Sequence, residues 1–186
     1  MEGHSRRSLL WAAGGATLLG ACGGSERSVR RPGVSRQDLA LLGDALAFER
    51  LEAAFYAQAA RQGGPAVLRE LAAQERAHAR TLERAIRDAG GRPPASGRLA
   101  LRLPEADGIP RLARRIEEQH AAALLALVPR IANAGLLATA LSIHAVEARH
   151  VVALRELEGT APAPAEALGE PVALAEALER VRGWLA

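Results

Sequence analysis

The sequence has one cysteine, few aromatic side chains and no lysine. A single cysteine among 186 residues, Cys22, excludes an intramolecular disulfide and any CxxC pair. All 24 basic residues are arginines, and they are spread among 21 acidic residues, so no basic cluster indicates nucleic acid binding. Aromatic residues make up only 3% of the chain, whereas alanine, leucine and arginine dominate, and this composition favours helices.

Apolar residues recur at steps of three and four in four segments, which places them on one face of a helix in each. The segments span residues 39–60, 68–89, 113–131 and 136–157. Turn signals separate the members of each pair, at Gly63–Gly64–Pro65 in the first and at Asn133 and Gly135 in the second. A polar segment with several prolines, residues 90–107, lies between the pairs. We therefore predict an all-α fold of two helical hairpins joined by a long crossover.

Six polar residues interrupt the apolar stripes of these helices. They are Glu49, Glu75, His78, Glu117, Glu147 and His150. A core does not accept four carboxylates unless their charge is neutralised. Two divalent cations would cancel that charge, and neutral imidazoles would add none, so the sequence predicts a buried site for two metal ions. Carboxylate and imidazole ligands suit Fe, Mn or Zn without selecting strongly among them.

The spacing of the six residues supports a metal site. Two Glu-x-x-His pairs begin at Glu75 and at Glu147, and the two side chains of each pair project from the same face of their helix. Within each pair of helices, the midpoint between the two glutamates falls at the turn, at Gln62 and at Ala132. The predicted ligands on the two helices of each hairpin should therefore lie at the same height along the bundle axis. One Glu-x-x-His pair alone is often an exposed ion pair, but two such pairs with two further glutamates favour a metal site.

Four motifs carry a resemblance to a known family, at residues 48–56, 74–78, 116–129 and 142–150. Across residues 36–158 the chain resembles the ferritin-like superfamily, specifically exported ferritin-like domain proteins related to rubrerythrin. The resemblance implies a four-helix bundle that binds two Fe or Mn ions per chain. It also implies that Glu49 and Glu117 are terminal ligands and that Glu75 and Glu147 bridge the ions. The histidine of each Glu-x-x-His pair would cap one ion.

Three further residues are weaker candidate ligands. Glu52 lies one turn beyond Glu49 and could replace it or join it. Glu118 is adjacent to the preferred glutamate of its helix but lies off the apolar face. His120 completes a third Glu-x-x-His pair, yet we favour a supporting or surface position for it and for His144.

Tyr56 follows the ligands on the first helix, one step along the same stripe. It could donate a hydrogen bond or an electron to the site, or it could be an ordinary core aromatic. The related family often has a second tyrosine where this chain has Leu124, so the resemblance implies one hydrogen-bond donor fewer near one ion.

Residues 1–22 resemble an export signal rather than part of the fold. Residues 5–10 resemble a twin-arginine motif, although an ordinary basic signal start remains an alternative. The apolar stretch at residues 8–20 is too short to span a membrane stably. Residues 19–22 resemble a bacterial lipobox that ends at Cys22, which predicts a lipid anchor at this cysteine; a free cysteine is the alternative. We therefore expect an exported protein, tethered to a membrane on the periplasmic face of the cell envelope.

Two polar segments flank the predicted bundle. Residues 23–34 are typical of a flexible tether, and the bundle itself is expected over residues 35–158. Residues 159–186 form a proline-rich connector and a short amphipathic helix from about 172 to 185. That helix should pack on the outside of the bundle or at a subunit contact, which leaves a homodimer open.

These observations predict a dinuclear metal protein that reacts with oxygen or peroxide, by ferrous oxidation, peroxide reduction or substrate oxidation. Without a CxxC pair there is no rubredoxin-type electron donor, so electrons must come from Fe(II) itself or from a partner. A lipid tether and a proline-rich tail do not suit a storage cage. The alternative is a non-catalytic helical scaffold or stress-protection protein of the envelope, with structural metal or none.

Overall fold

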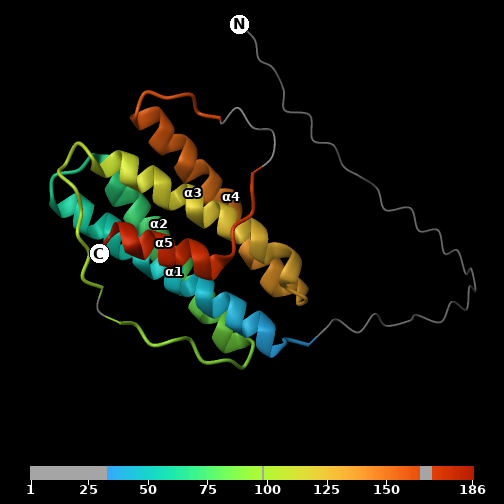
Figure 1. The fold of residues 1–186 in the computed structure, drawn as a ribbon. Helices are drawn as coiled ribbons and strands as arrows, with labels where there is room; N and C mark the ends of the chain where they lie inside the picture. The colour runs from blue at the N-terminus through green and yellow to red at the C-terminus, as the bar shows by residue number, and fades with distance from the viewer. Residues whose placement is uncertain (1–32, 98, 164–168) are drawn as a thin grey trace, which may run out of the picture. The chain divides into compact units, whose positions relative to one another are not determined.

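Helices are the only regular secondary structure among the described residues, which confirms the predicted all-α class. The computed structural model describes residues 33–97, 99–163 and 169–186 (Figure 1). The helices are α1 (Arg36–Arg61), α2 (Ala66–Asp88), α3 (Ile109–Leu127), α4 (Ala134–Leu157) and α5 (Leu174–Trp184). All belong to the unit Arg31–Ala186. The predicted export signal, Cys22 and most of the predicted tether lie outside the described residues.

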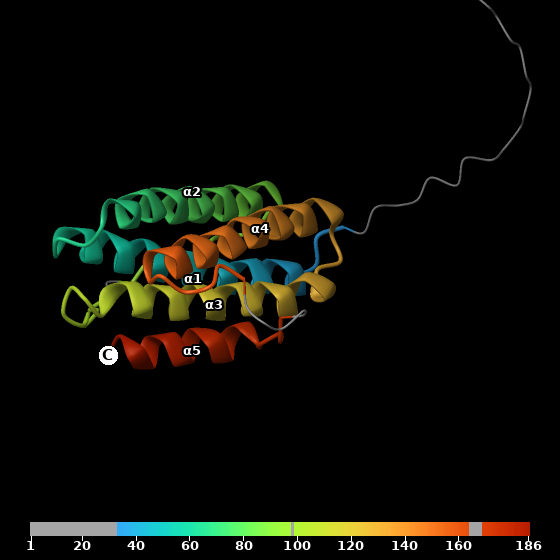
Figure 2. The same ribbon diagram turned by 90° about the horizontal axis from the view of Figure 1, so that it is seen from above.

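Helices α1 and α2 form one antiparallel hairpin, and α3 and α4 form the other (Figures 1 and 2). The first turn includes Gly63 with a φ of +83°, a conformation that glycine adopts without strain. The second turn is a short 3-10 segment, Val128–Arg130, followed by Asn133, whose side chain caps α4. The apolar pattern predicts a third helix that runs to about residue 131. That boundary is wrong: the helix ends at Leu127 because Pro129 cannot continue an α-helix.

The crossover between α2 and α3 runs back along α1, as predicted for a bundle of this type (Figure 1). Two side chains of α1 bind its backbone: Arg50 donates to the Pro94 carbonyl at 2.7 Å, and Gln58 donates to the Leu101 carbonyl at 3.0 Å. The Arg102 amide then donates to the Leu185 carbonyl at 2.8 Å, just beyond α5. The crossover is therefore fastened both to the bundle and to the end of the chain.

Helix α5 packs against the outer side of α3, as the amphipathic pattern predicted for a position outside the bundle (Figure 2). Its apolar face, Leu174, Ala177, Leu178 and Val181, is buried. The guanidinium of Arg115 in α3 lies 4.0 Å from the ring centroid of Trp184, at the end of α5.

Helix α4 is long and apolar enough to cross a membrane by length and composition alone, with a mean hydropathy of 1.2. The core helix of a globular bundle meets the same criterion, and α4 directs Glu147 and His150 into the interior. Its outer side carries the exposed apolar residues Leu141, Val152 and Leu157.

Asp38 connects the two hairpins. Ser35 Oγ accepts a hydrogen bond from the Asp38 amide at 2.9 Å, and Asp38 Oδ2 accepts one from the Ser35 amide at 3.0 Å, which forms a capping box at the start of α1. Asp38 Oδ1 accepts a further hydrogen bond from the Ala132 amide at 2.8 Å, in the turn before α4. One buried carboxylate therefore fixes the height of one hairpin against the other.

Replacing Asp38 by alanine should lower the free energy of unfolding by about 2–4 kcal/mol. The change removes the Asp38 half of the capping box and leaves the Ser35 and Ala132 amides without their acceptor. Urea denaturation followed by circular dichroism measures the loss. The matched control is Asp44→Ala, at an exposed position of the same helix, which should change stability by less than about 0.5 kcal/mol. Equal stability of the two variants would contradict this role of Asp38.

Candidate metal centre

Each of the four bundle helices sends acidic or histidine side chains into the middle of the bundle. Five glutamates there have no exposed surface: Glu49 and Glu52 from α1, Glu75 from α2, Glu117 from α3 and Glu147 from α4. Three histidines join them: His78 from α2, His120 from α3 and His150 from α4. Among the ion pairs of the described residues, none joins an arginine to these five carboxylates. Their charge is therefore balanced only by the histidines or by a bound cation.

One group of potential metal ligands surrounds His78. Its Nδ1 lies 2.9 Å from Glu147 Oε1, 3.2 Å from Glu75 Oε2 and 3.3 Å from Glu49 Oε2. One ligand atom from each of these four residues lies within 4.8 Å of all the others. Four donors from three helices thus converge on one point.

A second group surrounds His150 in the same way. Its Nδ1 lies 2.9 Å from Glu75 Oε1, 3.1 Å from Glu147 Oε2 and 3.5 Å from Glu117 Oε2. Glu75 and Glu147 therefore belong to both groups, and each directs one oxygen to His78 and the other to His150. The two imidazole rings lie 6.0 Å apart between centroids.

The two histidines have different surroundings on their far side. His150 is almost fully buried, and its Nε2 lies 2.9 Å from Gln74 Oε1. Donation of a proton from Nε2 to this amide oxygen would leave Nδ1 able to bind a cation once its own proton is released, the arrangement typical of a metal-binding imidazole. Gln74 was not predicted as a site residue, because the stripe pattern does not reveal that the residue before Glu75 reaches α4.

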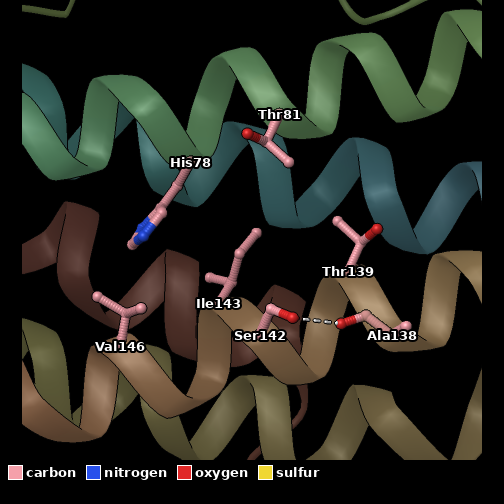
Figure 3. Close-up of a pocket in the computed structure, with 7 residues that line it drawn as sticks. All are labelled: His78, Thr81, Ala138, Thr139, Ser142, Ile143 and Val146. Carbon is pink, nitrogen blue, oxygen red and sulfur yellow. Dashed lines mark hydrogen bonds between the residues drawn. The ribbon is translucent and has the colours of Figure 1, made fainter. Parts of the chain in front are cut away.

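His78 instead borders a surface pocket of about 370 Å³ between α2 and α4. Figure 3 shows its side chain pointing from α2 towards α4, with Thr81 and Thr139 on the rim. The His78 side chain is 13% exposed, whereas that of His150 is 4% exposed. The cluster is therefore reached from this pocket through His78.

Tyr56 donates a short hydrogen bond to Glu117 Oε1. It is also a fully buried core residue, so the hydrogen-bond donor and the core aromatic considered from the sequence are the same side chain. Burial raises the pKa of the Tyr56 phenol, and the nearby Glu117 carboxylate raises it further. The hydroxyl therefore keeps its proton. The corresponding side chain from α3, Leu124, is buried and has no hydrogen to donate. Glu117 thus has a hydroxyl partner that Glu49 lacks.

His120 lies inside the bundle and not at its surface, so the surface position considered for it is wrong. Its ring stacks on Phe48 with centroids 4.3 Å apart and planes 7° from parallel. Its Nδ1 lies 2.7 Å from Glu52 Oε2, and Glu49, Glu52 and His120 form a third group of converging ligand atoms. The signal in the sequence was the position of His120 on the apolar stripe of its helix, three residues after Glu117.

The weaker candidate Glu118 and the histidine expected outside the site, His144, both lie away from the cluster. Glu118 contacts Arg114 at 2.9 Å and Arg155 at 2.6 Å, with 29% of its side chain exposed. This placement matches its position off the apolar face of α3. His144 lines a separate pocket near the connector that follows α4.

The comparison with known proteins agrees with this architecture. The sequence profile of the ferritin-like domain matches residues 37–160. The chain belongs to the ferritin-like domain family. A conserved hypothetical protein, Rv2844 from Mycobacterium tuberculosis, has a crystal structure of similar fold, with a TM-score of 0.59 and 23% sequence identity. That similarity covers 70% of this chain and 96% of the other. No functionally curated protein matches this ferritin-like chain.

The carboxyl groups of this ferritin-like cluster fall into two electrostatic classes. Burial raises the pKa of Glu49, Glu52 and Glu117 well above the usual carboxyl value, and the neighbouring carboxylates raise it further. Burial acts on Glu75 and Glu147 as well, but hydrogen bonds from the two histidines outweigh it and lower their pKa. The shared carboxylates are thus the two that stay ionised most readily.

The pKa values of the His78 and His150 imidazoles are raised, whereas those of Glu75 and Glu147 are lowered. Burial alone would lower their pKa, but the three carboxylates close to each Nδ1 raise it to about 12. The metal-free cluster therefore holds extra protons on these two rings. A cation that binds at Nδ1 must displace them, so metal binding and proton release are linked.

The stability of the metal-free protein should fall as pH rises above about 6.5, the pKa of histidine in the unfolded chain. Below that value both states bind the two imidazole protons; above it the folded state still binds them and the unfolded state does not, up to about pH 12. Each such proton lowers the free energy of unfolding by about 1.4 kcal/mol per pH unit.

Urea denaturation at pH 6.5, 7.5 and 8.5 with a chelator present tests this dependence. Saturating Mn(II) should abolish the decline, because the ion displaces the protons in the folded state. A metal-free protein whose stability is constant or rises over this range would show that the histidines are not protonated in the folded cluster.

Proposed function

We propose that the ferritin-like bundle binds a dinuclear iron or manganese centre. The observation that carries the proposal is the geometry of Glu75 and Glu147, each of which divides its two oxygens between the His78 group and the His150 group. A carboxylate arranged in this way bridges two cations. Glu49 would complete the ligands of one ion and Glu117 those of the other, as the family resemblance implies.

The hydrogen bonding of the cluster fits this assignment. Both oxygens of Glu49, Oε1 of Glu75, Oε2 of Glu117 and Oε1 of Glu147 are buried and accept no hydrogen bond from the described residues. Buried oxygens without partners are strongly unfavourable unless a cation supplies the missing interactions. Four carboxylates and two neutral imidazoles are the donor set of ferritin-like dinuclear sites.

Oxygen- or peroxide-linked redox chemistry is the reaction that such a site supports, because two adjacent iron ions together supply two electrons. The residues of this chain position and shield the reaction. The pocket beside His78 admits a small molecule, whereas Gln74 and the surrounding core close the His150 side. Tyr56 holds a proton within reach of Glu117. Ferrous oxidation and peroxide reduction both fit a site of this size.

Metal analysis of the purified protein by plasma mass spectrometry tests the centre. Anaerobic loading with Fe(II) should give at least two ions per chain, and Glu75→Ala with His150→Ala should lose both, because the first residue is shared by the two groups. The control is Glu118→Ala with His144→Ala, outside the cluster, which should keep the wild-type content. Wild-type protein without bound metal after loading would reject the proposal.

A structural metal site is the second candidate function, and the complete burial of all five carboxylates favours it. Both candidates bind metal, but they differ in the effect of the bound ions. A redox centre consumes oxygen or peroxide when loaded with Fe(II), and a structural centre raises the unfolding temperature without turnover. Oxygen uptake by the loaded protein therefore separates them.

We propose, from the sequence alone, that the protein is exported and anchored to a membrane of the cell envelope through a lipid on Cys22. The support is the lipobox-like end of residues 19–22, the twin-arginine-like motif before it and the polar segment that precedes the bundle.

Replacing Cys22 by alanine should release the protein from the membrane fraction of cells, because the only thiol able to carry the lipid is removed. Immunoblots of membrane and soluble fractions measure the change, with Ser25→Ala as the control that leaves the cysteine intact. Membrane association that persists in the Cys22 variant would contradict lipidation at this residue.

A further inference from the structure

Glu52 and His120 take no part in the two ligand groups that share Glu75 and Glu147. Both side chains are nevertheless fully buried, and they meet where α1 faces α3. They occupy equivalent places in the two hairpins: Glu52 follows Glu49 by three residues, and His120 follows Glu117 by three. Each of these helices therefore presents a second polar group one turn beyond its first.

The polar atoms of this pair have no hydrogen-bond partners among the described residues. This holds for both oxygens of Glu52 and both ring nitrogens of His120. His120 Nδ1 and Glu52 Oε2 are only 2.7 Å apart, but the contact is not aligned as a hydrogen bond. Two donor atoms at such a distance without a hydrogen bond between them are compatible with two ligands of one cation.

Glu49 is the third member of this group and lies nearest the other ring nitrogen of His120. Its Oε1 is 3.9 Å from His120 Nε2, and one ligand atom from each of Glu49, Glu52 and His120 lies within 4.8 Å of the others. The stacking of Phe48 on the His120 ring holds the imidazole in this orientation. Three donors from two helices are thus fixed around one position, beside the His78 group.

The charge of the cluster allows a further cation: five ionised carboxylates leave a net charge of −1 with two divalent ions and of +1 with three. The cluster contains five buried carboxylates, and two divalent ions would cancel four of their charges. No arginine among the described residues forms an ion pair with Glu52, so its charge has no partner except His120. In its ionised form, a buried carboxylate in this situation is costly unless a cation accompanies it.

We infer that Glu49, Glu52 and His120 bind a third divalent cation next to the dinuclear centre. Two carboxylates and one imidazole suit iron, manganese or zinc, the same class of ion as the main centre. The inference rests on the proposed dinuclear function, because Glu49 is shared with the His78 group.

Anaerobic titration with Co(II), followed by gel filtration and metal analysis, tests the inference on the purified protein. The wild type should bind three ions per chain. His120→Leu and Glu52→Gln should each bind two, because each removes a ligand of the third position only. Glu118→Gln and His144→Leu are matched controls outside the cluster and should still bind three. Circular dichroism checks that every variant is folded.

Each other result has a distinct meaning. Two ions in the wild type and two in both variants would overturn the third position and leave the dinuclear proposal intact. Three ions in wild type and variants alike would place the extra ion elsewhere and also overturn it. No bound ion in the wild type would reject both proposals. A second measurement does not depend on the variants: anomalous diffraction from crystals of the Co(II)-loaded wild type should show a peak between Glu52 and His120, and its absence beside two strong peaks would overturn the inference.

Discussion

Mutual repulsion among buried carboxylates is the constraint on which the rest of this structure depends. Five glutamates from four helices meet in a region without exposed surface and without an arginine partner among the described residues. Hydrophobic packing around them, from Phe48, Phe55 and the leucines of the same stripes, forces the carboxylates together at the expense of their hydration. The bundle can hold this arrangement only by taking up protons or cations, which is why its electrostatics and its proposed chemistry have one origin.

The two hairpins resemble each other, but the differences between them are chemically informative. Each contributes a glutamate from its first helix, a Glu-x-x-His pair from its second helix, and one further polar group one turn along the first helix. At equivalent positions of the two hairpins, the first has Tyr56 and Glu52 where the second has Leu124 and His120. The two histidines differ as well: His78 borders a pocket, whereas His150 contacts the side-chain amide of Gln74. Repeated backbone geometry thus places equivalent candidate ligands, while single residue differences give the two halves of the cluster different hydrogen bonding and different exposure.

Much of this arrangement follows from periodicity. Steps of three and four identified the bundle helices, and the turns at Gly63 and Asn133 set the height of the six polar residues that the structure brings together. Contacts between helices could not be obtained in this way, because a stripe indicates which face is buried and not what lies opposite. The link from Gln74 to His150, the meeting of Glu52 with His120, and the bond from Asp38 to the Ala132 amide all depend on how neighbouring helices are rotated and spaced. The end of α3, in contrast, could have been predicted from the sequence. Pro129 marks it, but the apolar pattern continues past this residue to Ile131 and led to the wrong boundary.

The opening beside His78 has a consequence for the order of events in the bundle. His150 is closed off by Gln74, so an ion that enters by this opening has to pass the outer position before it reaches the inner one. In the proposed dinuclear centre, the inner position would therefore fill first and empty last. The inner ion would be retained while the outer ion is exchanged, so two positions built from nearly identical donors acquire different residence times from the shape of the access path alone.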